Sequence, residues 1–190
     1  MRGALIALAL LILPVGAEAQ SPRAAQAAEA RRAEIDRLFE MLKAAPDEAA
    51  AAMVEERLRT LWAEAASPAT VLLLRRGARN LASRSYEEAV EDYDAALILA
   101  PESAEAWHQR AQAFAAMGDT TAAARDLQEA LRLEPRHFGA LVTLSRLQEQ
   151  RGDAAAALRS MEAALALHPH LRGGQERVRE LRRKVEGDVT

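Results

Sequence analysis

Cysteine is absent from the 190-residue sequence, and aromatic residues make up only 4% of it. The absence of cysteine excludes disulfide bonds, thiol catalysis and cysteine-ligated metal sites. Hydrophobic residues nevertheless reach 50%, and 45 residues are alanine. The core must therefore be built from small contacts, as between closely packed helices. This apolar content also excludes a wholly disordered chain.

Strand-favouring residues are scarce, and glycine and proline number only nine and seven. Alanine, leucine, arginine, glutamate and glutamine dominate instead, and all of them favour helices. A β-rich fold is thus excluded, and the composition predicts an all-α protein. Lysine occurs only twice, and the formal net charge is −3. The chain lacks the positive charge typical of nucleic-acid-binding proteins, so we expect no nucleic-acid partner.

One apolar run stands out, and it lies at the amino terminus. Arg2 precedes the apolar residues 3–13, and residues 17–19 (Ala-Glu-Ala) have the form of a cleavage site. The run is shorter than the roughly 20 residues of a membrane-spanning helix. We therefore expect residues 1–19 to be a signal peptide, cleaved after Ala19. The mature protein would be periplasmic and would have no transmembrane segment; an uncleaved anchor is the alternative.

An internal repeat of 34 residues organises most of the remaining chain. Pro101, Pro135 and Pro169 lie 34 residues apart, and the segments before them align. An alanine stands five and twelve residues before each proline, as expected where two helices cross and only a methyl group fits. Each proline suits the end of a helix, because it cannot continue one. The six alanines are Ala89, Ala96, Ala123, Ala130, Ala157 and Ala164.

This pattern resembles the tetratricopeptide repeat, a helix–turn–helix unit of 34 residues with a W-x2-L-G-x2-Y, A-x3-F and P motif. The resemblance implies a right-handed α-solenoid of three stacked repeats, since one repeat cannot bury its apolar face alone. We place the repeats at residues 70–103, 104–137 and 138–171. The motif positions are Trp107 for tryptophan, Gly77 for glycine and Phe114 for tyrosine, with Gly118 and Gly152 at the turn between the helices.

Two flanking segments look helical but do not follow the repeat. Residues 20–69 carry two apolar stripes, at 35–42 and 54–62, with Pro46 between them. We expect an amino-terminal helical hairpin that packs on the first repeat. Residues 172–190 predict a capping helix and tail that keep the end of the solenoid soluble. A docking patch for an acidic partner or an anionic lipid is the alternative for this basic segment.

Serine residues predict two helix starts within the repeats. Ser85 and Glu88 have the spacing of a capping box, for a helix that begins near residue 86. Ser103 is the expected N-cap of the helix that carries Trp107.

No catalytic motif is present: the sequence has no glycine-rich phosphate loop, no G-x-S-x-G and no H-E-x-x-H. We therefore expect neither an enzyme nor a cofactor. Of the four histidines, His108, His137, His168 and His170, two flank Pro169, and this spacing is poor for a metal. No metal site is expected. His168 is interpreted as a residue at a helix end, where an imidazolium favours the dipole.

The resemblance implies a concave groove, formed by the first helix of each repeat, that binds a protein or peptide. The lysine, asparagine and arginine set that holds a peptide carboxylate in part of the family is missing. One alternative is a structural subunit of an envelope assembly that uses its convex or terminal surfaces, and a small-molecule binder or enzyme is another. The sequence leaves open whether the hairpin covers part of the groove, and what the oligomeric state is. The groove residues carried over are Leu74, Leu81, Glu105, His108, Gln112, Val142, Arg146 and Glu149.

Overall fold

The computed structural model describes residues 22–64 and 67–187, and the expected signal peptide lies outside these ranges. Within them every regular element is an α-helix, and no strand is present. No helix in this part of the chain is long and apolar enough to cross a bilayer. The helices are α1 (Pro22–Lys43), α2 (Glu48–Glu64), α3 (Pro68–Ala82), α4 (Tyr86–Leu99), α5 (Ala104–Met117), α6 (Thr120–Leu133), α7 (Phe138–Gln150), α8 (Ala154–Leu167) and α9 (Gly174–Gly187).

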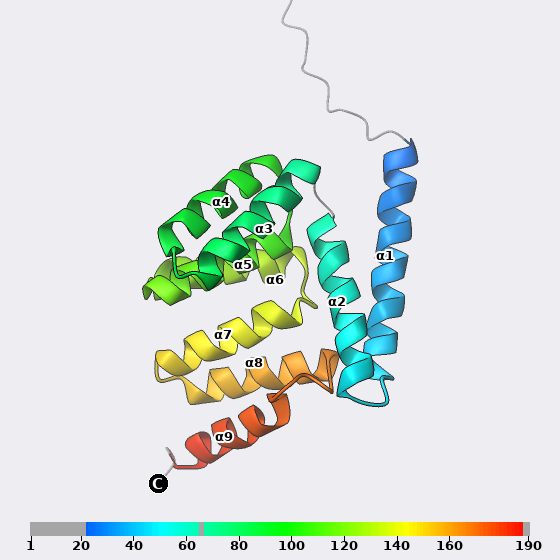
Figure 1. The fold of residues 1–190 in the computed structure, drawn as a ribbon. Helices are drawn as coiled ribbons and strands as arrows, with labels where there is room; N and C mark the ends of the chain where they lie inside the picture. Colours follow the sequence, from blue (N-terminus) through cyan, green and yellow to red (C-terminus); the bar gives the residue numbers. More distant parts are fainter. Residues whose placement is uncertain (1–21, 65–66, 188–190) are drawn as a thin grey trace, which may run out of the picture.

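Six of these helices form three antiparallel pairs, α3–α4, α5–α6 and α7–α8, which stack one on the next (Figure 1). The α9 helix follows and packs on α8, the second helix of the last pair. This arrangement confirms the predicted all-α solenoid of helix–turn–helix repeats.

Small residues let the paired helices approach closely. The six alanines of the repeat pattern are all fully buried. The approach is also close at Gly77 of α3, where an added Cβ would lie 2.5 Å from Cε1 of Tyr93 in α4. The buried Tyr93 ring thus packs directly on the backbone of α3, and glycine is the residue that leaves room for it.

Side chains cap most of the repeat helices. Ser103 accepts a hydrogen bond from the backbone N–H of Ala106, as predicted, and Asp119 and Asp153 cap α6 and α8 in the same way. The capping box expected at Ser85 is wrong, because its side chain makes no cap hydrogen bond. Its ψ of 72° is close to the 78° and 75° of the two aspartates, whose longer side chains reach the helix. The shorter serine reaches it from the more extended backbone of Ser103, where ψ is 99°.

The hairpin of α1 and α2 runs along one side of the stack, from α3 to α8 (Figure 1). The expected packing on the first repeat is incomplete: α2 does contact α3, but the large apolar side chains of the hairpin meet the third repeat. Phe39 and Trp62 belong to one cluster with Phe138 of α7 and Ala164 of α8. Bulky rings need partners that offer a matching area, and Phe138 at the start of α7 supplies it. Ala63 makes the smaller contact with the core of the first repeat.

A buried hydrogen bond also ties the hairpin to the third repeat. The interpretation of His168 as no more than a residue at a helix end is incomplete. His168 does end α8, but it is fully buried, and its Nε2 lies 3.0 Å from Oε2 of Glu55 in α2. This hydrogen bond lowers the pKa of the Glu55 carboxyl, with smaller help from Arg59 and against the effect of burial. The contact holds α2 across the end of α8.

Candidate binding groove

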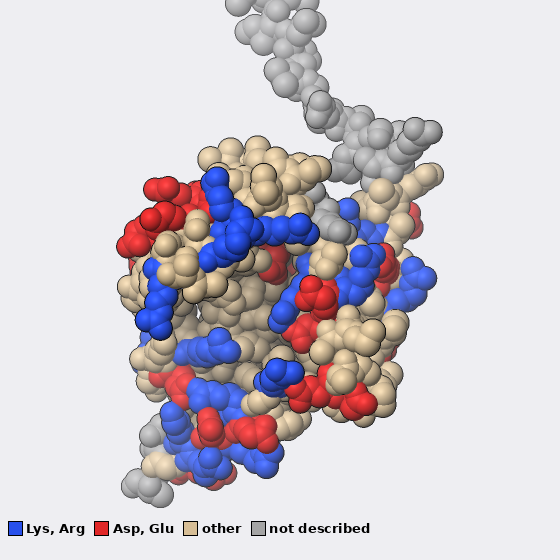
Figure 2. Space-filling view, viewed as in Figure 1, with Lys and Arg blue, Asp and Glu red and all other residues tan. Residues whose placement is uncertain are grey.

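A cavity of about 540 Å³ lies on the concave side of the solenoid. Its walls come mainly from α3, α5 and α7, from α2 of the hairpin, and from α9 and the turn that leads into it. In Figure 2, lysine and arginine side chains lie on several sides of the hollowed face. The groove expected between the first helices of the repeats is therefore present, and the hairpin forms an additional wall.

The hairpin covers one end of the expected groove and leaves the other residues open to the cavity. Leu74 is buried beneath α2 and lines a separate cavity of about 230 Å³ with Ala63. Glu149 also lies outside the main cavity, where it pairs with Arg177 and Lys184 of α9. The expected groove residues that do line the main cavity are Leu81, Glu105, His108, Gln112, Val142 and Arg146.

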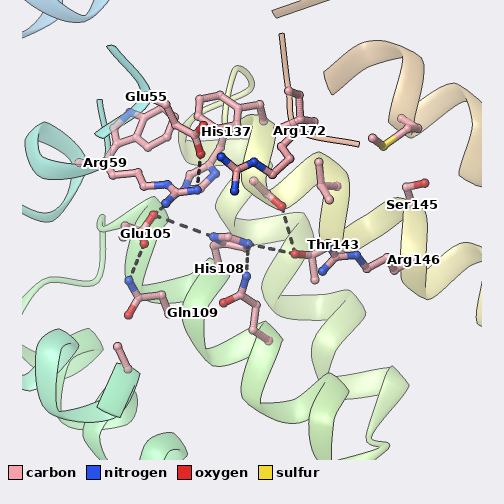
Figure 3. Close-up of a pocket in the computed structure, with 18 of the residues that line it drawn as sticks. Glu55, Arg59, Glu105, His108, Gln109, His137, Thr143, Ser145, Arg146 and Arg172 are labelled. Carbon is pink, nitrogen blue, oxygen red and sulfur yellow. Dashed lines mark hydrogen bonds and ion pairs between the residues drawn. The ribbon is translucent and has the colours of Figure 1, made fainter. Parts of the chain in front are cut away.

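Glu105 and two histidines form a buried polar cluster at the wall of this cavity (Figure 3). Oε2 of Glu105 lies 2.9 Å from Nε2 of His137 and 3.9 Å from Nδ1 of His108. His137 is the N-cap of α7, and its Nδ1 accepts a hydrogen bond of 3.2 Å from the backbone N–H of Ala140. The proton of His137 therefore sits on Nε2, which donates it to Glu105.

The opposite side of His108 faces α7. Its Nε2 lies 3.1 Å from Oγ1 of Thr143, and that hydroxyl donates its own proton to the carbonyl of Gly139. The amide nitrogen of Gln112 lies 3.1 Å from the same Nε2, while the other ring nitrogen, Nδ1, is on the side of Glu105. This Nδ1 is buried and has no hydrogen-bond partner among the described residues. Gly139 allows the close packing, since a Cβ there would lie 2.9 Å from Cε1 of His108.

Burial and contacts act in opposite directions on the acid of this cluster. Burial is the largest influence on the pKa of Glu105 and would raise it, but the combined interactions with His108 and His137 outweigh burial and hold the pKa well below its usual range. Burial also lowers the pKa of His108, more than its interaction with Glu105 raises it. The cluster at neutral pH is therefore a carboxylate beside a neutral His108 imidazole.

Four arginines from different elements reach the same cavity: Arg59, Arg146, Arg172 and Arg177. Three of them pair with acidic side chains, Arg59 with Glu55, Arg172 with Glu48, and Arg177 with Glu149. The fourth, Arg146 on α7, is exposed and has no hydrogen-bond or ion-pair partner among the described residues. The cavity thus presents one uncommitted positive charge.

Sequence reasoning identified Arg146 but missed the other cavity arginines and His137. The missed arginines lie on α2 and in or just before α9, outside the repeat register that was used to place groove residues. His137 occupies the last position assigned to the second repeat, outside the first helices that supply the expected groove residues. The spacing of Glu105 and His108, three residues apart on one helical face, was the available signal for the polar cluster.

Comparisons with known proteins agree with this architecture. Residues 76–140 match the tetratricopeptide repeat family. A TPR repeat-containing protein of Rhizobium etli is 29% identical over 156 residues, which cover 82% of this chain and 76% of that protein.

Solved structures extend the likeness to the fold. The Sgt2 TPR domain from Aspergillus fumigatus has a TM-score of 0.60 and 24% identity, over 64% of this chain and 82% of that one. The first TPR of Spaghetti (RPAP3), bound to the HSP90 peptide SRMEEVD, has a TM-score of 0.60 and 18% identity, over 63% and 95%. The Yersinia enterocolitica type III secretion translocator chaperone SycD has a TM-score of 0.55 and 18% identity, over 65% and 94%. The chain therefore resembles tetratricopeptide repeat proteins in sequence over residues 76–140, and its fold is similar to that of solved tetratricopeptide repeat domains.

Proposed function

We propose that this protein binds a short segment of another protein within the groove between α3, α5, α7 and α2. The observation that carries the proposal is the cavity of about 540 Å³, which lies within the size range of specific ligand sites. Its walls combine apolar side chains, such as Leu81 and Val142, with polar groups that lack partners. Such a cavity fits a few residues of extended chain rather than a folded domain.

Some of the similar structures are complexes with a bound partner, which supports this mode of binding. One is the RPAP3 domain with an HSP90 peptide, and another is the complex of the TPR2B domain of yeast Sti1 with pHsp70. The chain described here lacks the carboxylate-binding set of its family, so its ligand is not carried over from them. The uncommitted Arg146 instead favours a segment with an acidic side chain, because arginine forms strong hydrogen bonds with carboxylates.

A displayed library of random peptides, selected on the purified mature chain, tests the proposal. Selected peptides should be enriched in aspartate or glutamate. Arg146→Glu should weaken their binding by at least about tenfold, the loss of about 1.4 kcal/mol expected for a charged hydrogen bond. The matched control is Arg151→Glu, the same charge reversal at the end of α7 but outside the cavity. Equal binding by both variants would place the ligand elsewhere.

A structural role in an assembly is the second candidate, and one observation favours it. Leu72 of α3 and Ile98 and Leu99 of α4 are exposed on the first repeat, which the hairpin leaves largely uncovered. Apolar side chains of this size in water are typical of protein contacts. A partner that is retained by Arg146→Glu but lost by the double change Leu72→Ser, Ile98→Ser would favour the assembly role.

We also propose that the protein works in the periplasm, on the basis of its amino-terminal sequence. Expression in a bacterial host should give a periplasmic chain whose first residue is Gln20, read by mass spectrometry. Ala17→Arg should block cleavage because the site requires small residues, whereas Ala24→Arg should not. A cytoplasmic chain that retains Met1 would contradict the proposed location.

A further inference from the structure

We propose that Glu105, His108 and His137 form a binding site for one divalent transition-metal ion of the zinc type, at the wall of the groove. The three side chains come from the start of α5 and the N-cap of α7 (Figure 3). One ligand atom from each, a carboxylate oxygen and two imidazole nitrogens, lies within 4.8 Å of the other two. Two imidazoles and a carboxylate are a donor set that zinc accepts in proteins.

The spacing of the donor atoms suits such an ion. Zinc–ligand distances of about 2.0–2.1 Å in a tetrahedron place neighbouring ligand atoms about 3.3 Å apart. The distances from Oε2 of Glu105, 2.9 Å to His137 and 3.9 Å to His108, lie on either side of that value. Small rotations of the side chains would therefore bring all three atoms into the first coordination sphere.

The unpartnered nitrogen of His108 is the second, independent observation. The Nδ1 of His108 lies 3.9 Å from Oε2 of Glu105, beyond hydrogen-bond distance, and it has no hydrogen-bond partner among the described residues. His108 is only 7% exposed, so water cannot readily satisfy this nitrogen. A cation bound between Nδ1 and the carboxylate of Glu105 would give this buried nitrogen the partner that it lacks.

The surroundings of these three side chains also favour the binding of a metal ion over the binding of a proton. Glu105 and His137 are 9% and 2% exposed, so the ion would be held in a largely dry site. The contacts with the two histidines keep Glu105 ionised against the effect of its burial on its pKa, while burial keeps His108 neutral, and these are the forms that bind a metal. All three side chains border the cavity, so the remaining coordination position would face the groove and accept water or a ligand atom.

Metal binding has a specific consequence at the start of α7. An ion on Nε2 of His137 moves the ring proton to Nδ1, which then can no longer accept from the N–H of Ala140. The loss of one N-cap hydrogen bond is a small cost beside the free energy that coordination of zinc supplies in structural sites. The amide proton of Ala140 should therefore exchange faster with solvent when the metal is bound.

Titration of the chelator-treated mature chain with Zn²⁺, followed by calorimetry, tests the site. We expect one ion per chain, and we expect His108→Gln and Glu105→Gln to weaken binding by at least about tenfold each. Circular dichroism would establish that both variants fold. His137 is left intact, because it also caps α7 and stacks on Trp62 at 4.3 Å between ring centroids.

Two further readouts separate this site from others. Co²⁺ bound at His137 should quench the fluorescence of Trp62, measured in a Trp107→Phe background, and amide exchange should report the release of Ala140. His170→Gln is the control, because His170 lies with His168 in a separate cavity of about 380 Å³.

No uptake of Zn²⁺, or uptake that is unchanged in His108→Gln and Glu105→Gln, would overturn the proposal. Uptake that is lost only in His170→Gln would also overturn it, since the ion would then lie in the other cavity. No peptide is present in these titrations, so their failure would leave the proposed peptide binding to be judged by its own experiment.

Discussion

Single residues set the closest approaches in this solenoid, and Gly77 is the clearest case. The ring of Tyr93 occupies the space that a side chain at position 77 would need. The repeat motif singles out this glycine from the sequence alone, but it does not reveal its partner. The contact explains why the first repeat combines a glycine in its first helix with a large aromatic residue in its second.

Gly77→Ala should therefore destabilise the protein even though alanine is the better helix former. Overpacking costs about 1–3 kcal/mol, and the gain in helix propensity offsets about 1 kcal/mol of it. We expect a net loss of up to about 2 kcal/mol, measured by urea denaturation. Gly187→Ala, where an added Cβ meets no neighbour, is the control and should be neutral or slightly stabilising. Equal stability of the two variants would contradict the contact with Tyr93.

The cluster of Glu105, His108 and His137 shows which contacts can be predicted from single residues and which cannot. Glu105 and His108 could be placed in the groove because both lie on the face of α5 that the repeat register points inward. His137 could not, because its role depends on its backbone position before α7 and on Trp62, which is distant in sequence. Local patterns identify helical faces, whereas the meeting of two chain segments is decided by the whole fold.

At the scale of elements, the repeats were predictable and the position of the hairpin was not. Proline and alanine recur at a fixed spacing, so α3 to α8 follow from the sequence with their order and pairing. The apolar stripes of α1 and α2 also indicate a helical hairpin, but a stripe does not say which surface it covers. Trp62 and Phe39 select the start of α7, because Phe138 offers a matching apolar area there.

The hydrogen bond between Glu55 and His168 predicts how the docking of the hairpin depends on pH. The folded state lowers the pKa of Glu55 below its ordinary value of 4.5, so this contact stabilises the protein above pH 4.5. The contribution is lost as the pH falls through the folded-state pKa. Glu55→Gln should therefore cost about 1–2 kcal/mol at pH 7 and progressively less below pH 4.5.

Urea denaturation at pH 7 and at pH 4 or lower measures this difference. Glu56→Gln, the adjacent residue of α2, is the matched control, because no hydrogen bond links its side chain to a histidine of the described chain. A cost of Glu55→Gln that grows on acidification would contradict the assignment of the contact.

At the scale of the whole molecule, α2 alters how the repeats depend on one another. A simple repeat array is stabilised by contacts between neighbours only. Here Ala63 of α2 joins the core of the first repeat, while Trp62 joins the core of the third. The helix therefore links repeats that do not touch through the stack alone, and this favours unfolding of the chain as one cooperative unit.

Trp62→Ala should remove that cooperativity. Loss of a buried tryptophan costs about 3–5 kcal/mol, and the hairpin should then detach at lower urea concentration than the repeats unfold. Trp107 in the second repeat becomes the sole tryptophan, so its fluorescence would follow the repeats while ellipticity follows all helices. Met53→Ala, on the exposed side of α2, should keep a single transition. Coincident transitions in Trp62→Ala would mean that the hairpin is not the link.

The same helix has a mechanical consequence. An unbraced solenoid can lengthen, shorten and change its pitch through small rotations at each interface between repeats. Because α2 contacts both the first and the third repeat, such changes in length and pitch would require Trp62 to leave its pocket. The width of the groove is therefore fixed before any ligand binds. A segment that enters it must fit this width, because the groove cannot adapt to the segment.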